Sequence, residues 1–263
     1  MDINYYWSGD KAARRRYAID HTNSVEMKWR NEIDQSIKDT KLYDDNSKFQ
    51  KPANIENIAM ILAAQGSVDA IFDHADQHTA VLNFASYKNP GGMFINGSRA
   101  QEECLCAESY LYNVLRQHMD YYEWNEQHKN RALYLNRALY SPHIVFEHNG
   151  KSMPCDVITC AAPNIMPSRK YGWGITDAEN SQALSDRIEF VLKVAADNNV
   201  DTLILGAFGC GVFGQDATEV CKLFLQHLKT YHCFKKVVFA VPEDMHSLNY
   251  YKFNDVLNKE VAN

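Results

Sequence analysis

The sequence predicts an α/β fold, with helices packed on a sheet that contains parallel strands. Two segments, residues 79–119 and 202–241, each pass from a short apolar run through a glycine-rich loop into a helical pattern. In the second segment another apolar run follows the helix, and such a strand–helix–strand unit implies parallel pairing with a right-handed crossover. The chain has 263 residues, of which 46% are hydrophobic, so it can bury the core that this fold requires.

The first fifty residues are polar and rich in charge, and they predict a helical extension docked on the core. The basic run of Lys11 and residues 14–16 is typical of a solvated helix face. We expect this extension, residues 1–50, and the remainder of the chain to form one domain spanning residues 1–263. The helical stripe of the extension lies within residues 21–37 and consists of Val25, Met27, Trp29, Ile33 and Ile37.

Residues 54–66 predict a helix that ends with Gly66 as its C-cap. Its apolar face, which begins just after Asn54, is formed by Ile55, Ile58, Ala59 and Leu62. Residues 79–85 are typical of a buried strand, and a loop rich in Gly, Asn and Pro follows at residues 86–97. A helix should begin near Ser98, with an inner face formed by Leu105, Leu111, Tyr112, Leu115 and Met119.

The rest of the chain predicts four more strands and two long helices. The strand-like apolar runs cover residues 143–146, 155–162, 202–208 and 236–241. Helical periodicity covers residues 179–197 and 216–231. The buried face of the first helix consists of Leu184, Ile188, Val191, Leu192 and Ala195, and that of the second consists of Val220, Leu223, Phe224 and Leu228.

The net charge of −6 argues against a reader of duplex DNA, because no global basic field would attract it. Residues 86–101 and 164–174 each contain two basic residues and no acid, which suits a small anionic ligand. The seven cysteines form no CxxC motif, so we expect reduced core thiols and no metal site. The N-terminus lacks a signal core, and no run approaches the ~18 apolar residues of a membrane span. We therefore expect a cytoplasmic protein without membrane contact.

The first loop that could carry chemistry is residues 89–103, between a predicted strand and a predicted helix. Adjacent glycines let the backbone approach a bulky ligand, and the helix start offers free N–H groups. A purely structural explanation also fits, because Ser98 and Gln101 have capping-box spacing and acids are favoured in a first helical turn. That explanation does not account for two acids, Glu102 and Glu103, directly after an acid-free glycine loop.

The second loop, residues 206–216, also leaves a predicted strand and enters a predicted helix. Three glycines within six positions expose backbone N–H groups that can form an anion-binding nest. Asp216 and Glu219 again have capping-box spacing, and no Gly-Lys-Ser/Thr follows, so the loop is not a Walker A motif. Because ligands of open α/β sheets bind beyond the carboxyl ends of strands, the two loops can meet in one site.

The first loop resembles the signature of the poly(ADP-ribose) glycohydrolase branch of the macrodomain fold, three glycines followed six to eight residues later by Gln-Glu-Glu. Here Gly91-Gly92-Met93 and Gln101-Glu102-Glu103 are separated by seven residues. Residues 206–214 are similar to the family's diphosphate-binding loop. Residues 139–142 and 157–164 resemble microbial and phage-type members.

This resemblance, which spans residues 80–241, implies a three-layer α/β/α macrodomain with a mixed central sheet and an N-terminal helical extension. It implies a glycohydrolase without a cofactor, whose partner is ADP-ribose or an ADP-ribosylated macromolecule. Glu103 would be the catalytic acid, and Glu102 would hold a ribose hydroxyl at the scissile bond. The implied ligand-binding residues of the first loop and its flanks are Asn83 and Asn89, facing the distal ribose, with Gly91, Gly92 and Gln101. Those of the second loop are Gly209, Cys210, Gly211 and Val212 for the diphosphate and Phe213 for the distal ribose.

The expected chemistry suits a carboxylic acid. Cleavage of a ribose C1″–O bond needs a proton donor for the leaving oxygen and stabilisation of an oxocarbenium-like centre. One carboxyl can donate the proton and then deprotonate the incoming water. A helix N-terminus lowers the pKa of such an acid, whereas burial, a neighbouring carboxylate and the substrate diphosphate raise it.

Met93 departs from the family pattern, because it stands where the third glycine would be. If that position needs a positive φ or close contact with the ligand, Met93 should strain the loop or narrow the cleft. A non-catalytic module that binds ADP-ribose or a related nucleotide, its activity impaired by Met93, is therefore the alternative to a hydrolase. A third possibility is a structural or interaction protein in which both loops are only caps and turns.

Overall fold

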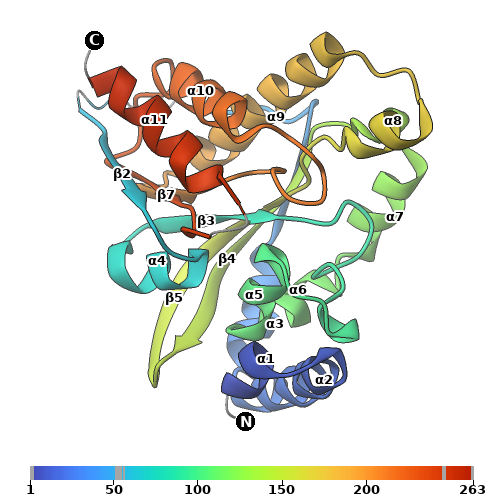
Figure 1. Cartoon of the computed structure of the whole chain (residues 1–263). Coiled ribbons are helices and arrows are strands. Elements are labelled where there is room, and N and C mark those ends of the chain that lie inside the picture. Colours follow the sequence, from blue (N-terminus) through green and yellow to red (C-terminus); the bar gives the residue numbers. More distant parts are fainter. Residues whose placement is uncertain (1–2, 51–54, 56, 245–246, 262–263) are drawn as a thin grey trace.

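A mixed sheet forms the centre of the computed structural model, and helices cover both of its faces (Figure 1). The structure describes residues 3–50, 55, 57–244 and 247–261. The strands are β1 (Lys41–Asp44), β2 (Ala59–Ala63), β3 (Thr79–Phe84), β4 (Arg137–His148), β5 (Lys151–Cys160), β6 (Thr202–Leu205) and β7 (Lys236–Ala240). Their order in the sheet is β1-β4-β5-β3-β6-β7-β2. The β1–β4 and β4–β5 pairs are antiparallel, and the other four pairs are parallel.

The helices form a layer on each side of the sheet (Figure 1). One layer consists of α1 (Asn4–Ser8), α2 (Lys11–Lys28), α3 (Arg30–Asp39), α4 (Ser67–His74), α5 (Gln101–Ala107) and α6 (Leu111–Leu115). The other consists of α9 (Asp177–Asp197), α10 (Ala217–Leu228) and α11 (Asn249–Val261). The connections contain α7 (Met119–Gln127), α8 (Met166–Tyr171) and the 3₁₀ turns η1 (Phe94–Asn96) and η2 (Asn130–Ala132). Along β3, Val81 packs into the first layer while Ala80 and Leu82 pack into the second, so both faces of the strand are buried.

The sheet topology brings the two glycine-rich loops to one edge. The β6–α10–β7 unit has the parallel pairing that the sequence predicts, with Leu203 opposite Val237. Strands β2, β3, β5, β6 and β7 all run in the same direction, so their carboxyl ends lie at the same edge. The first loop leaves this edge after Phe84 and the second after Leu205.

The helix predicted at residues 54–66 is wrong. Residues 59–63 form β2, which pairs with β7, and Asn54 lies outside the described residues. A short apolar run fits either a helix face or a strand, and here pairing with β7 decides between them. Gly66 has φ −73° and ψ 163° and is the N-cap of α4, so it begins a helix instead of ending one.

The helix predicted to begin near Ser98 and to include Met119 is two shorter helices, α5 and α6, and Met119 begins α7. The first break arises because the chain between α5 and α6 contacts β4. The backbone N–H of Glu147 donates to the carbonyl of Glu108 at 2.7 Å, and Ser109 forms an isolated bridge with Phe146. The predicted extension also breaks, at Trp29, into α2 and α3. The remaining predicted strands and helices are confirmed, although β4 begins at Arg137, six residues before the strand predicted at residues 143–146. The elements β1, α4, α7, α8 and α11 are absent from the sequence prediction.

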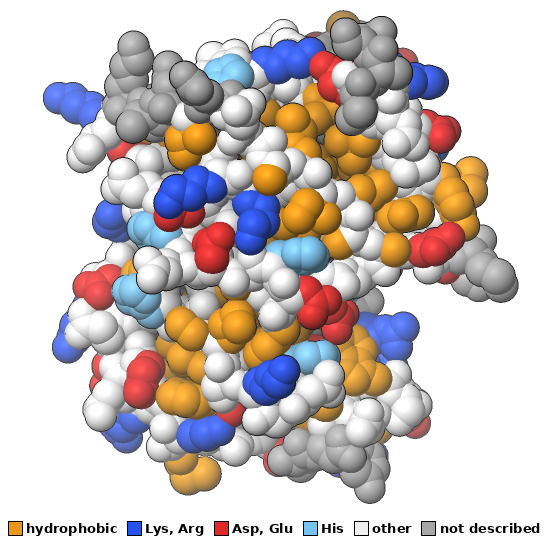
Figure 2. Space-filling model, turned by 90° about the vertical axis from the view of Figure 1, so that its left-hand side faces the viewer, with side chains coloured by type: hydrophobic (Ala, Val, Ile, Leu, Met, Phe, Trp, Pro, Cys, Tyr) orange, Lys and Arg blue, Asp and Glu red, His pale blue; other side chains and the backbone are white. Residues whose placement is uncertain are grey.

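The surface and the cysteines agree with the composition. On the face shown in Figure 2, basic and acidic side chains are interspersed over the surface. Among the described helices, none has the length and apolar character needed to cross a bilayer. All seven cysteines are free thiols, and four of them, Cys106, Cys155, Cys160 and Cys221, are buried in the core.

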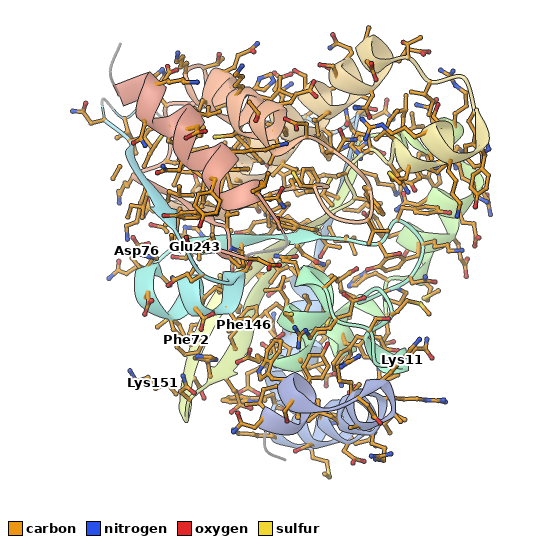
Figure 3. All side chains as sticks on the ribbon, in the orientation of Figure 1. Lys11, Phe72, Asp76, Phe146, Lys151 and Glu243 are labelled. Carbon is orange, nitrogen blue, oxygen red and sulfur yellow. The ribbon has the colours of Figure 1, made fainter. Side chains whose placement is uncertain are left out.

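The N-terminal helices contact the first loop at Gly97, which has φ +77°. The Tyr6 hydroxyl donates to the carbonyl of Ser98 at 2.8 Å, and Arg14 Nε donates to the carbonyl of Gly97 at 2.8 Å. Lys11 begins α2 beside this loop (Figure 3). Arg15 and its neighbour Arg16 are exposed, as predicted, but Arg14 is half-buried and fixes the loop to the extension.

We expect Gly97→Ala to lower the free energy of unfolding by about 3 kcal/mol, because the added Cβ would overlap the Lys11 carbonyl and lie 2.8 Å from the Arg15 nitrogen. Gly150→Ala is the matched control: Gly150 also has a positive φ (+75°), but none of the described atoms lies within 4 Å of its added Cβ. Chemical unfolding should show a loss of only about 1 kcal/mol there. Equal losses in the two variants would contradict the docking contact.

Candidate active site

The first loop covers the start of α5, and its glycines make the close approach possible. Gly91 and Gly92 have φ +63° and +61°. A Cβ at Gly92 would lie 2.6 Å from Glu103 Oε1 and 3.0 Å from Glu102 Oε2. The loop backbone therefore lies directly against both carboxyl groups, which only glycine permits at this position.

Glu102 is buried, with 3% of its surface exposed, and the protein holds both of its carboxyl oxygens. Oε2 accepts a hydrogen bond from the backbone N–H of Ser86 at 2.7 Å, and Oε1 accepts one from Asn83 Nδ2 at 3.2 Å. Burial raises the pKa of Glu102 to about 8, against the opposing effect of the Ser86 hydrogen bond. Glu102 therefore keeps its proton to a higher pH than an exposed glutamate does.

Glu103 lies beside Glu102 in a different environment. Its Oε1 accepts a hydrogen bond from the backbone N–H of Met93 at 2.9 Å, and 6% of the residue is exposed. Among the described residues, Oε2 has no hydrogen-bond partner, so this oxygen is free to donate or accept a proton. Hydrogen bonds therefore hold Glu102 through both carboxyl oxygens and Glu103 through only one.

Met93 does not strain the loop, so the expectation of strain is wrong. Its φ is −114°, a value open to any residue. Its side chain is 43% exposed, and its sulfur lies 3.8 Å from Asn89 Nδ2. The hydrogen bond that Glu103 accepts comes from the backbone N–H of residue 93, so it does not depend on which side chain stands there.

Gln101 and Asn83 contact protein groups in this structure. Gln101 Nε2 donates to Ser67 Oγ at 3.0 Å and to the Leu82 carbonyl at 2.8 Å, and its Oε1 accepts from the backbone N–H of Phe84 at 2.8 Å. The predicted capping box with Ser98 does not form, because Ala100 is the N-cap of α5. Asn83 is fully buried, and its Oδ1 has no hydrogen-bond partner among the described residues.

The second loop presents its tip to open space. Gly209 has φ +76°, and a Cβ there would lie 2.8 Å from that of Ala162. A Cβ at Gly211 would meet none of the described atoms within 4 Å, and the neighbouring Val212 is 82% exposed, while Cys210 is half-buried. Asp216 caps α10, as predicted, by accepting from the N–H groups of Thr218 and Glu219 at 2.9 and 3.2 Å.

An aromatic cluster joins the two loops, and sequence reasoning missed most of it. The rings of Tyr87 and Tyr134 are stacked with centroids 4.3 Å apart, and Phe213 lies 6.2 Å from Tyr134. Tyr87 lies two residues before the first loop, and Phe213 lies in the second. Tyr134 lies between β4 and η2, outside any recognisable motif, so no sequence signal indicated it.

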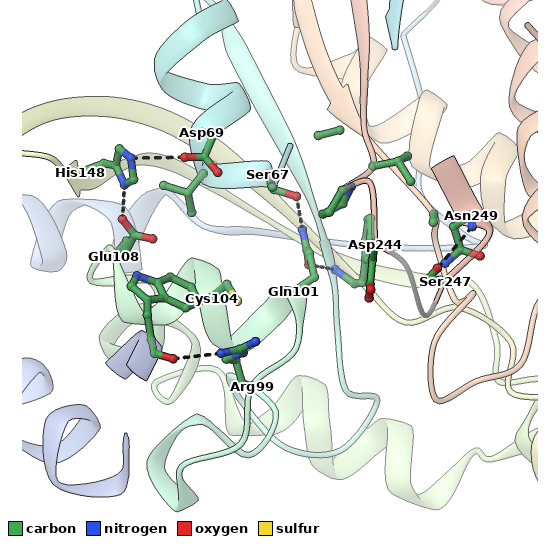
Figure 4. Close-up of a pocket in the computed structure, with 18 residues that line it drawn as sticks. Ser67, Asp69, Arg99, Gln101, Cys104, Glu108, His148, Asp244, Ser247 and Asn249 are labelled. Carbon is green, nitrogen blue, oxygen red and sulfur yellow. Dashed lines mark hydrogen bonds and ion pairs between the residues drawn. The ribbon is translucent and has the colours of Figure 1, made fainter. Parts of the chain in front are cut away.

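A pocket of about 560 Å³ adjoins the two loops on the side away from the aromatic cluster (Figure 4). It shares Phe84, Gln101 and Ala207 with the loop region and extends to the start of α4. At its far end His148 bridges Glu108 Oε2 at 2.5 Å and Asp69 Oδ1 at 3.3 Å. The sequence analysis missed this wall because α4, which carries Asp69, was not predicted. Within the described ranges, no group of three His, Cys, Asp or Glu side chains is placed to hold a metal ion.

The family model for the microbial-type PARG (poly(ADP-ribose) glycohydrolase) catalytic domain matches residues 10–148, more than half of the chain. The chain belongs to this family. The structure of the Thermomonospora curvata poly(ADP-ribose) glycohydrolase is similar with a TM-score of 0.83, at 25% identity over 93% of this chain and 99% of that one. The Deinococcus radiodurans poly(ADP-ribose) glycohydrolase, solved in complex with ADP-ribose, gives a TM-score of 0.76 at 28% identity over 87% of this chain and 97% of that one.

These similarities confirm the macrodomain-like PARG fold that the sequence motifs predict, including the mixed sheet and the N-terminal helices. A search of curated proteins gave no match.

We expect the stability difference between the protein and its Glu102→Gln variant to depend on pH. The folded pKa of Glu102 is about 8 and its ordinary value is 4.5, so between these values the folded state holds a proton that the unfolded chain has lost. The contribution of Glu102 to stability is thus fully present below pH 4.5 and falls as pH rises toward 8. Chemical unfolding at pH 5 and pH 8 measures this decline, and a parallel pH dependence of both proteins would contradict it.

Proposed function

We propose that the chain is an ADP-ribosyl glycohydrolase, which cleaves the ribose glycosidic bond of poly(ADP-ribose) or of ADP-ribosylated macromolecules. The observation that carries this proposal is the pair of buried carboxyls, Glu102 and Glu103, held under the glycine loop with different hydrogen-bond partners. Membership of the PARG family supports it. Water is the only co-reactant, and no cofactor is required.

In this proposal ADP-ribose lies along the carboxyl edge of the sheet. The N–H groups of Gly209, Gly211 and Val212 bind the diphosphate, since the loop tip faces open space. The N–H of Cys210 donates to the carbonyl of Ala207 at 3.1 Å, so Cys210 shapes the loop between these donors. The distal ribose lies between the two loops, near Asn89 and Phe213. The adenosine occupies the adjoining pocket, whose apolar walls and few polar groups suit a nucleoside.

Glu103 is the proposed general acid and base. As the C1″–O bond breaks, its carboxyl donates a proton to the leaving oxygen, and the resulting carboxylate then takes a proton from the water that adds to C1″. The partner-free Oε2 is the oxygen suited to this role. Glu102, whose raised pKa favours the protonated form, donates a hydrogen bond to a ribose hydroxyl.

We also propose that the N-terminal helices and the sheet work as one domain across residues 1–263. The hydrogen bonds from Tyr6 and Arg14 to residues 97 and 98 couple the extension to the catalytic loop. The extension would then set the position of the glycines over the two acids.

We expect Glu103→Gln to lower the rate of ADP-ribose release by at least about 100-fold, because the amide cannot exchange the proton. Release from poly(ADP-ribose), from mono-ADP-ribosylated protein and from ADP-ribosylated DNA is quantified, with ADP-ribose affinity measured by calorimetry as the control for folding. Unchanged release in the variant, or release from none of these substrates by the unmodified protein, would refute the proposal.

Met93→Ala separates the hydrolase from the alternative, an ADP-ribose-binding module with impaired turnover. The hydrogen bond from the backbone N–H of residue 93 to Glu103 is retained in this variant, and the loop is unstrained. We therefore expect the rate of ADP-ribose release to change less than about threefold, which is under ~0.7 kcal/mol in activation free energy. A large gain in rate upon removal of the side chain would show that Met93 obstructs turnover. Binding of ADP-ribose without release, in both proteins, would select the binding module.

A further inference from the structure

The segment that carries Tyr134, residues 130–134, has a strained backbone. Four of its five residues have a positive φ without being glycine: Asn130 (+43°), Arg131 (+53°), Ala132 (+70°) and Tyr134 (+57°). We call this segment the Tyr134 turn. Such strain persists only where the surrounding structure fixes it, and it clusters at functional sites. A plain connection between α7 and β4 would not require it.

A buried arginine fixes the Tyr134 turn. Arg187 of α9 is 2% exposed, and its Nη2 donates to the carbonyl of Leu133, inside the turn, at 3.4 Å. Its Nη1 donates to the carbonyl of Ala161, which directly follows β5, and its Nε donates to Asn136 Oδ1 at 2.7 Å. Because a buried guanidinium needs its donors satisfied, these bonds hold the turn against the end of β5.

Tyr134 then contacts the chain just before the first loop. Its ring stacks on that of Tyr87, with centroids 4.3 Å apart and an angle of 20° between the planes. Tyr134 is 8% exposed, so this is an interior contact. Stacked aromatic pairs contribute beyond the burial of their surface. The stack thus attaches Tyr87 to a turn that Arg187 already holds in place.

Tyr87 directly follows Ser86, whose backbone N–H donates to Glu102 Oε2 at 2.7 Å. On the other side of Ser86, the N–H of Ala85 donates to the carbonyl of Cys160 at 3.1 Å and so attaches the chain to β5. Ser86 therefore lies between two anchored residues, one fixed by the sheet and the other by the stack. Both anchors together set the direction of the N–H group that Glu102 accepts.

We propose that Tyr87 and Tyr134 are positioning residues for the proposed active site, because their stack holds the Ser86 N–H on Glu102. Arg187 acts one step further away, by fixing the Tyr134 turn. The effect on catalysis rests on the proposed hydrolase, whereas the position of the Ser86 N–H can be measured in the unligated protein.

The hydrogen bond from Ser86 also provides a readout. It opposes the rise that burial causes in the pKa of Glu102, so weakening it should raise that pKa further. The other titratable groups that interact with Glu102 are Glu103 and Cys106 on α5 and Tyr121 and Tyr122 on α7. The test changes none of these four groups, so a change in the pKa of Glu102 reports on the Ser86 contact.

The test compares Tyr87→Ala and Tyr134→Ala, which remove the stack from either side, with Tyr87→Phe, which keeps the ring. The matched control for general loss of stability is Phe49→Ala, which removes a ring stacked on Tyr43 of β1 with centroids 5.7 Å apart. Hydrogen exchange of the Ser86 amide and the pKa of Glu102 are measured by NMR in the unligated protein. The values of kcat and KM are measured for ADP-ribose release.

Both stack-removing variants should accelerate exchange of the Ser86 amide about tenfold, a factor within the contribution of one stacked pair, and raise the pKa of Glu102. They should lower kcat about tenfold and change KM less than about twofold, since the carboxyl is misplaced while the ligand contacts remain. Tyr87→Phe should keep the unmodified values. Phe49→Ala should lower the free energy of unfolding without changing the pKa of Glu102.

An unchanged Ser86 exchange rate in both stack-removing variants, or a pKa of Glu102 that stays the same or falls, would overturn the proposal. An effect of Tyr87→Phe as large as that of Tyr87→Ala would do so too. If the unmodified chain releases ADP-ribose from no substrate while the variants still change the exchange rate and the pKa, the hydrolase assignment fails and the positioning contact stands.

Discussion

The backbone of the first loop lies directly over the two acids at the start of α5, and much of the site depends on this contact. A Cβ at Gly92 would lie 2.6 Å from Glu103 Oε1, so the contact requires glycine. Because the loop is this close, Ser86 and Met93 direct their N–H groups to different carboxyls. The adjacent acids are thereby placed in distinct environments, which is the usual way in which one site assigns separate roles to two carboxyls.

The rest of the structure keeps the loop in this position. Gln101 links the start of α5 to β3 and to Ser67 of α4 through three hydrogen bonds. The N-terminal helices contact the other end of the loop at Gly97, so an extension distant in sequence contributes to the geometry of the acids. The parallel strands bring the second loop to the same edge of the sheet, and the Tyr87–Tyr134–Phe213 cluster closes the gap between the loops.

The sequence predicts those parts of the fold whose signals are local. The β6–α10–β7 unit, β3 and α9 follow from apolar periodicity and caps, and the two motif loops indicate Glu102, Glu103 and the glycines. Residues 59–63 could not be assigned correctly, because pairing with β7 and not local pattern makes them a strand. Burial of Asn83, the bracing role of Gln101 and the participation of Tyr134 depend on tertiary contacts, which no spacing in the sequence encodes.

The most direct test of the central contact is the rate of ADP-ribose release by Gly92→Ala compared with Gly150→Ala. Both glycines have a positive φ, but an added Cβ lies against the carboxyls at Gly92 and, at Gly150, within 4 Å of none of the described atoms. We predict a loss of at least about 100-fold for Gly92→Ala, since displacement of a catalytic group by about 1 Å has effects of this size. Gly150→Ala should keep the unmodified rate. A folded Gly92→Ala protein that releases ADP-ribose at the unmodified rate would contradict the account.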